Sequence, residues 1–191
     1  MPWTTSEPAV RLRERSHAFD VFAETMDGWR RHLAGRNAAL GADDGWEYAI
    51  TVEGWEPAIL TSSADGVVTE STPSFPVIVF GDKGKVIVRI PLVLLGNADP
   101  TTWSYAATLA GQEGFPSSGV RRIRDIEAES QQWRFGGAPG DINHTRIIDV
   151  AWAERGQQES WLSMYPSVSS GSFDDLAADD YPILALIGPG A

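Results

Sequence analysis

The chain contains no cysteine, which excludes disulfides, thiolate metal sites and cysteine nucleophiles together. Among its basic residues only Lys83 and Lys85 are lysines, and the 191 residues carry a formal net charge of −11. Because phosphate binding needs a basic face, this charge argues against nucleic acid as a partner. No apolar run is long enough to span a bilayer, so the sequence predicts no transmembrane segment. Residues 1–6 do not form a signal peptide, and the signal of an exported protein is expected upstream of them.

Motifs for catalysis are also missing from the sequence. No Gly-x-Ser-x-Gly elbow occurs, and the three histidines, His17, His32 and His144, are scattered. Glu47 and Glu53 lie on the polar face of one expected strand, about 20 Å apart at the rise of a strand, which is too far for an acid and nucleophile pair. We therefore predict no catalytic residues and no enzyme activity within this chain.

Cofactor and metal sites are not predicted, although two alternatives stay open. Calcium would need hard oxygen ligands, but no run has the regular spacing of a calcium loop. Haem b would need a methionine with a histidine as axial ligands, and no spacing rule joins any such pair. The calcium candidates are Asp43 with Asp44, the acids around Asp174, and Asp141 with Asn143; the haem candidates are Met26 or Met164 with His17, His32 or His144. Residues 143–145 also match the N-glycosylation triplet, a pattern that is frequent by chance.

The centre of the chain is predicted to consist of structural strands and turns. Residues 85–90 are rich in β-branched side chains and predict a strand that ends at Pro91, which cannot donate to a ladder. After a short apolar turn at residues 92–95, apolar and small side chains alternate from Trp103 to Ala110 and predict a second strand. Residues 76–80 and 85–88 flank Gly-Asp-Lys-Gly and form the strongest hairpin signal of the chain.

Further short strands are expected on both sides of this centre. Strands are predicted at residues 17–24, 46–53, 58–61, 67–68, 147–150 and 181–187, with a hairpin turn at Asp65-Gly66. Residues 154–164 have helical composition, and residues 29–33 are expected to form one helical turn. Many short strands, turn residues between them and little helix favour an all-β fold, an antiparallel β-sandwich with a short helical segment near the C-terminus. We see no linker, so residues 1–191 are predicted to be one domain.

Eight tryptophans are many for this length. Trp46 and Trp103 alternate with other apolar residues and are expected in the core. Trp29, Trp55 and Trp133 lie near turns, where an exposed ring can stack on a sugar. We take these three as candidate carbohydrate-binding residues, with the alternative that each caps an end of the sandwich.

An ordered series of segments resembles the glucodextranase C-terminal-like domain family. The matching segments are Gly35-Arg36-Asn37, residues 45–50, 52–55, 88–92 and 94–96, Trp103-Ser104-Tyr105, residues 111–115 and 133–137, Ile148-Asp149-Val150 and the region around Gln158-Glu159. The resemblance implies a β-sandwich related to DOMON-type and carbohydrate-binding modules. It also implies a non-catalytic, extracellular role that holds an enzyme such as a glucodextranase or amylopullulanase, or the cell surface itself, to polysaccharide or cell-wall glycan. A haem-binding electron-transfer module and a ligand-free structural domain are the alternatives.

Two departures from the family pattern bear on partners. The family's first strands, which precede the strand at residues 17–24, are absent, and the loop at residues 114–119 differs from the usual form. A sandwich without its first strands leaves an open sheet edge. We therefore expect pairing of that edge with a parent enzyme domain or with a second copy of the chain.

Overall fold

The computed structural model describes residues 17–24, 30–33, 35–54, 57–112, 123–151, 154 and 156–188, without the side chains of residues 17–19. Its strands are β1 (His17–Glu24), β2 (Ala39–Leu40), β3 (Tyr48–Val52), β4 (Ala58–Ser62), β5 (Val68–Ser71), β6 (Val77–Phe80), β7 (Lys85–Val88), β8 (Ser104–Gln112), β9 (Ile123–Arg124), β10 (Ile147–Val150) and β11 (Ile183–Leu184). Its helices are α1 (Gln157–Ser163) and four short 3₁₀ turns, η1 (Leu92–Leu95), η2 (Pro100–Thr102), η4 (Phe173–Asp175) and η5 (Ala178–Asp180).

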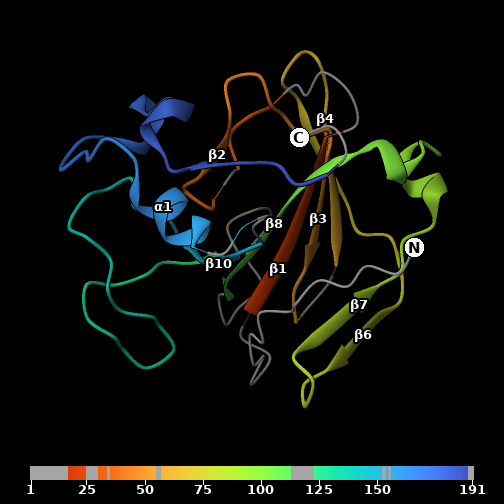
Figure 1. Ribbon diagram of the computed structural model, residues 1–191, viewed down its shortest axis with the longest axis horizontal. Helices are drawn as coiled ribbons and strands as arrows, with labels where there is room; N and C mark the ends of the chain where they lie inside the picture. The colour runs from red at the N-terminus through yellow and green to blue at the C-terminus, as the bar shows by residue number, and fades with distance from the viewer. Residues whose placement is uncertain are drawn as a thin grey trace.

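A curled antiparallel sheet, here called the main sheet, forms the body of the molecule (Figure 1). Its strand order is β10-β8-β1-β3-β4-β5, and β9 adds to the end of β8. The hairpin β6–β7 forms a separate two-stranded sheet, and β2 pairs with β11 in a parallel two-residue sheet. The predicted all-β fold with one short helix near the C-terminus is therefore confirmed.

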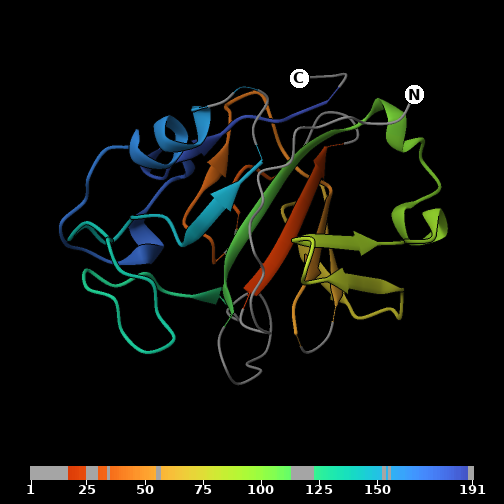
Figure 2. The same ribbon diagram turned by 60° about the horizontal axis from the view of Figure 1, so that its bottom comes forward.

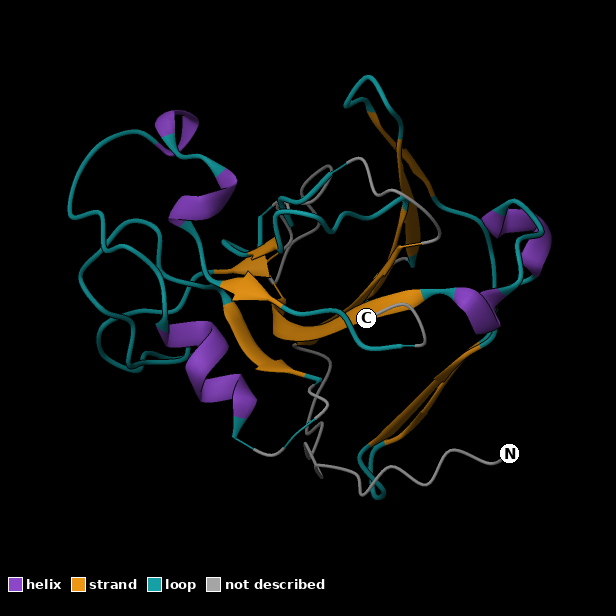
Figure 3. Cartoon of the chain, turned by 45° about the horizontal axis from the view of Figure 1, so that its top comes forward, coloured by secondary structure: helices purple, strands orange, loops and turns teal. Residues whose placement is uncertain are grey.

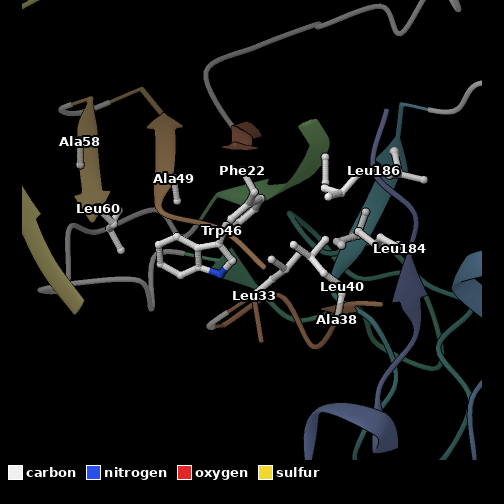
Figure 4. Packing of buried hydrophobic residues seen from close by; sticks show 13 residues of the cluster. Phe22, Leu33, Ala38, Leu40, Trp46, Ala49, Ala58, Leu60, Leu184 and Leu186 are labelled. Carbon is white, nitrogen blue, oxygen red and sulfur yellow. The ribbon is translucent and has the colours of Figure 1, made fainter. Parts of the chain in front are cut away.

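Both faces of the main sheet are buried, because side chains alternate between two hydrophobic cores. Phe22, Ala49 and Leu60 point into the first core, whereas Ala23 and Ile50 point into the second. The first core is closed by β2, β11 and α1 around the fully buried Trp46 (Figure 4). The second core is closed by the β6–β7 hairpin and η1 around Trp103, so the hairpin supplies a second β-layer on that face (Figure 2).

The tryptophan predictions for the core are confirmed, since Trp46 and Trp103 are 1% and 2% exposed. Phe22 meets Trp46 edge to face with ring centroids 5.7 Å apart, and Tyr48 stacks on Trp103 at 6.0 Å. Such aromatic pairs add stabilisation beyond the area that they bury. Each core therefore has one tryptophan at its centre.

Three local predictions need correction. Residues 30 and 32 are not helical: Arg30 and His32 form isolated bridges with Trp46 and Ala39, because these extended partners satisfy their backbone groups. The last strand is shorter than predicted, because only Ile183 and Leu184 pair with β2. The helix spans Gln157–Ser163 rather than residues 154–164, and it begins after Gly156, whose φ is 93°.

The expected open edge does not lie beside β1. This strand is at the centre of the main sheet, where β3 pairs with one side and β8 with the other. Both sides of β1 are therefore paired within the described residues. The described strand edges belong instead to β5, to β10 and to the β6–β7 hairpin.

A buried ion pair sits on the first-core face of the main sheet. Asp20 of β1 is fully buried, and Arg36 reaches it from the loop before β2 with two hydrogen bonds of 2.9 and 2.6 Å. Arg36 also lies 3.5 Å from the hydroxyl of Thr51 on β3. Its loop is turned by Gly35 and Asn37, whose φ angles of 77° and 49° are left-handed. The loop is therefore shaped to deliver one guanidinium to the sheet.

We expect the Arg36→Met variant to lose about 3–5 kcal/mol of unfolding free energy, because it leaves the Asp20 carboxylate buried without a partner. Urea or guanidinium denaturation measures this loss. The double variant Asp20→Leu/Arg36→Met removes both charges and should recover most of the stability. A single variant as stable as the parent would show that the ion pair contributes little.

Candidate ligand-binding site

A long irregular segment, residues 125–140, projects from the main sheet after β9 and is called the arm here (Figure 3). Its two sides are joined by backbone hydrogen bonds, among them Glu127 N–H to Phe135 C=O at 2.8 Å and Gly137 N–H to Ala128 C=O at 3.1 Å. At its tip, Gln131 and Arg134 donate to each other's carbonyls, which leaves Trp133 inside a tight turn. The arm is thus an ordered, hairpin-like loop.

Glycine is needed where the two sides of the arm meet. A Cβ on Gly136 would lie 2.3 Å from the backbone nitrogen of Ser130 and 2.9 Å from the carbonyl carbon of Glu129. No side chain fits at that distance from backbone. The close approach places the neighbouring Phe135 at a defined position on the arm.

Trp133 is presented to solvent by this turn. Its side chain is 64% exposed, and its φ of 71° is left-handed, a conformation that costs a bulky residue about 1–3 kcal/mol. The Arg124 guanidinium donates a hydrogen bond to the Trp133 carbonyl and helps to hold the turn. Trp133 and Phe135, which is 46% exposed, border a small depression of about 210 Å³.

A larger cavity of about 680 Å³, the arm cavity, lies between the arm, the segment at residues 141–148, and α1 with the residues that follow it. Phe135 lines both the depression and the arm cavity, so the two lie next to each other at this residue. Ile126, Ile147 and Leu162 supply apolar walls. The polar side chains of the lining are Asp141, His144, Thr145, Glu159, Ser163, Tyr165 and Ser167. The volume is in the range of small-ligand sites, and the mixture of apolar walls and a few polar groups is typical of them.

His144 connects the arm to the segment at residues 141–148 through hydrogen bonds of both ring nitrogens. Its Nδ1 lies 2.7 Å from the carbonyl oxygen of Asp141, and its Nε2 lies 3.1 Å from Asp125 Oδ1 at the root of the arm. The hydrogen bond with Asp125 raises the pKa of His144, and the same bond lowers the pKa of Asp125 to about 2. Arg146 Nε adds a further contact to Asp125 at 3.3 Å. The contacts of Asp125 with His144 and Arg146 therefore hold the root of the arm by charge.

Asp141 is the buried acid of the cavity. It is 7% exposed, and its Oδ1 has no hydrogen-bond partner within the described part of the chain. Burial, followed by a hydrogen bond to the Asp141 carboxylate, raises the pKa of Tyr165 to about 12. The phenol therefore keeps its proton and acts as a donor. A carboxylate oxygen without a donor favours a ligand or water that supplies one.

The three candidate tryptophans have different outcomes. Trp29 and Trp55 lie outside the described residues, and Trp133 is exposed on the arm. The sequence singled out the aromatic segment at residues 133–137 but not the cavity, whose acid, histidine and tyrosine come from separate loops. No local signal in the sequence joins Asp141, His144 and Tyr165.

Asn143, the acceptor of the N-glycosylation triplet, is fully buried. Its amide nitrogen donates to the carbonyls of Pro166 and Asp180, and its oxygen accepts a 3.0 Å hydrogen bond from the Val168 backbone. The side chain thus joins three chain segments and is used entirely in the fold.

The metal and haem candidates are placed as follows. Among the described residues no three His, Asp or Glu side chains gather as a metal site. The His32 ring packs against Tyr181 with centroids 5.0 Å apart and planes tilted by 30°, and burial lowers the pKa of His32. Met164 is 72% exposed at the end of α1. Met26 and the side chain of His17 lie outside the described residues.

No described helix has the length and apolar character needed to cross a membrane. One family model matches residues 16–176, and its description is the C-terminal binding module, SLH-like, of glucodextranase. No protein with curated annotation matches the chain.

The pKa shift of His144 predicts a pH dependence of the arm. Because the folded pKa is raised above 6.5, the imidazolium stabilises the fold fully below pH 6.5, and this stabilisation is lost as pH rises through the folded value. Denaturation midpoints between about pH 6 and about pH 9 should therefore fall for the parent chain. His144→Gln should flatten this dependence. The lowered pKa of His32 affects stability only as the pH falls through about 6.5, so His32→Gln should leave the slope above about pH 7 unchanged.

Proposed function

Since the chain belongs to the family of C-terminal, SLH-like binding modules of glucodextranase, we propose that it binds a polysaccharide or cell-wall glycan at the arm and thereby attaches a larger enzyme or surface protein to it. In this proposal the module is extracellular and non-catalytic. The glycan lies across Trp133 and Phe135, and one sugar unit enters the arm cavity. Any catalytic step belongs to another domain of the parent protein.

The presentation of Trp133 is the observation that carries this proposal. Trp133 has a left-handed backbone conformation and is 64% exposed, so this large aromatic residue contributes little to the stability of the fold. Strained residues persist where the surrounding structure holds them, and they gather at functional sites. The arm, with its obligatory glycine and its charged root, holds this ring. A flat exposed ring can cover the apolar face of a sugar.

The cavity beside the ring supplies groups suited to hydroxyls. The carboxylates of Asp141 and Glu159 are acceptors for sugar hydroxyls, and the aromatic residue Phe135 lines the same cavity. Sugars present several hydroxyls that both donate and accept. The Asp141 carboxylate lines this cavity, and its buried Oδ1 has no donor within the described part of the chain, so a donor brought to it by a ligand would offset the cost of that acceptor.

Binding without turnover agrees with the contacts of His144. A general base needs a nitrogen facing the group that it deprotonates. Both ring nitrogens of His144 face acceptors that belong to the fold, namely Asp125 and the Asp141 carbonyl. In this proposal His144 therefore holds the arm in position.

Affinity electrophoresis in native gels that contain starch, dextran or isolated cell-wall polymer tests the proposal. We expect the parent chain to be retarded by at least one polymer. Trp133→Gly should abolish most of the retardation while the fold is kept, because glycine adopts the left-handed φ without strain. The thermal midpoint of this variant should stay within a few degrees of the parent.

Phe173→Ala is the matched control, because Phe173 is an aromatic residue of similar exposure, 50%, that lines neither the depression nor the arm cavity. This variant should migrate like the parent in every gel. Unretarded migration of the parent chain in all polymers, or equal retardation of the Trp133→Gly variant, would contradict glycan binding at the arm.

A further inference from the structure

The β6–β7 hairpin exposes an apolar strand. Ile78, Val79 and Phe80 of β6 are 38%, 58% and 36% exposed, although Val77 and Val88 at the base of the hairpin pack against the second core. By contrast, β5 at the edge of the main sheet carries Thr-Glu-Ser after its first residue. Charged and polar edge residues discourage pairing with another chain, whereas an apolar, uncharged edge strand invites it. The strand β6 has no charged residue.

Within the part of the chain that the structure describes, the outer side of the β6 backbone is also unpaired. In the hairpin register Ile78 faces Ile87 and Phe80 faces Lys85, and Arg89 N–H donates to the Pro76 carbonyl at 3.0 Å. Since hydrogen-bonded and non-hydrogen-bonded pairs alternate, residues 76, 78 and 80 bond to β7, and Val77 and Val79 turn their N–H and C=O groups outward. These outward groups have no backbone partner among the described residues.

We propose that β6 pairs in antiparallel fashion with β6 of a second copy of this chain, so that the two hairpins form one four-stranded sheet. The edge is self-complementary about a twofold axis at Ile78. In this register Val77 of one copy faces Val79 of the other, and the two pairs exchange four backbone hydrogen bonds. Ile78 then faces Ile78 of the other copy as a non-hydrogen-bonded pair, with Cα atoms about 4.5 Å apart.

The charges of the hairpin permit this pairing. Asp82 and Lys83 lie in the turn, Lys85 begins β7 and Arg89 follows it, so none of them lies on the paired edge. With two β6 strands in the middle, the two β7 strands are separated by three strand spacings, about 14 Å. This exceeds the screening length of about 8 Å at physiological salt, and the repulsion between the cationic strands is weak.

This inference is independent of glycan binding, because the hairpin lies at the opposite side of the molecule from the arm (Figures 1 and 2). Pairing through β6 leaves both arms open. Two glycan sites held in one dimer would then act together on a polymer, which increases avidity without new contacts.

Single-cysteine variants test the register, since the chain has no cysteine of its own. In a dimer of the Ile78→Cys variant the two cysteines would lie opposite each other, and their Cα separation of about 4.5 Å allows a disulfide. We expect this variant to form a covalent dimer under mild oxidation at least ~10-fold faster than the matched variant Thr69→Cys, which places the thiol on the exposed edge strand β5. Equal rates for the two variants would overturn the proposal.

Multi-angle light scattering of the parent chain from about 1 μM to about 1 mM supplies the second measurement. The mass should rise towards that of a dimer, and more so at higher salt, because each copy has a net charge of −11. The Val79→Pro variant loses only an outward N–H group, so it should be monomeric and keep the thermal midpoint of the parent chain. If the proline variant does not fold, Val79→Lys replaces it in this measurement.

A parent chain that stays monomeric, or a Val79→Lys variant that dimerises like the parent, would overturn the proposal. Binding of a monomeric parent chain to neutral phosphatidylcholine vesicles, kept at high salt and lost in Val79→Lys, would overturn it as well, because the exposed strand would then meet lipid. Loss of glycan binding alone would leave it untouched, so the two proposals fail separately.

Discussion

The ion pair between Asp20 and Arg36 is the constraint that links the core to the candidate site. The guanidinium reaches the central strand of the main sheet, and the loop that carries it touches the segment below the arm. The Arg36 carbonyl accepts the backbone N–H of Arg146 at 3.0 Å, and the Asn37 side chain donates to the His144 carbonyl at 2.9 Å. A buried charge at the sheet therefore sets the position of the residues that hold the arm.

Local sequence patterns were sufficient for most of the main sheet. The alternation around Tyr48–Val52 and Ser104–Gln112 and the turn residues of the two hairpins act over a few residues, and their elements appear where they were expected. The two-residue strands β2 and β11 have no such signal, because distant backbone hydrogen bonds create them. The sequence marks Arg36 only as a member of the Gly35-Arg36-Asn37 segment of the family resemblance, since nothing near it shows that its charge is buried.

The candidate site was predictable in one part only. The sequence marked Trp133 as an aromatic residue near a turn, and its neighbour Phe135 lay in the same segment. The cavity depends on contacts across long sequence separations: Asp125 with His144, and Tyr165 with Asp141. The need for Gly136 also follows from backbone that approaches it from across the arm. Composition and periodicity carry no information on such approaches.

The burial of Asn143 has a consequence for producing the protein. Oligosaccharide transfer in a eukaryotic secretory pathway acts on Asn-x-Thr before the chain has folded, and a glycan at that side chain is bulky and needs the surface. In the folded chain the amide is enclosed by the carbonyls of Pro166 and Asp180. A molecule modified there cannot close this region, so a host without N-glycosylation is the suitable source of folded material.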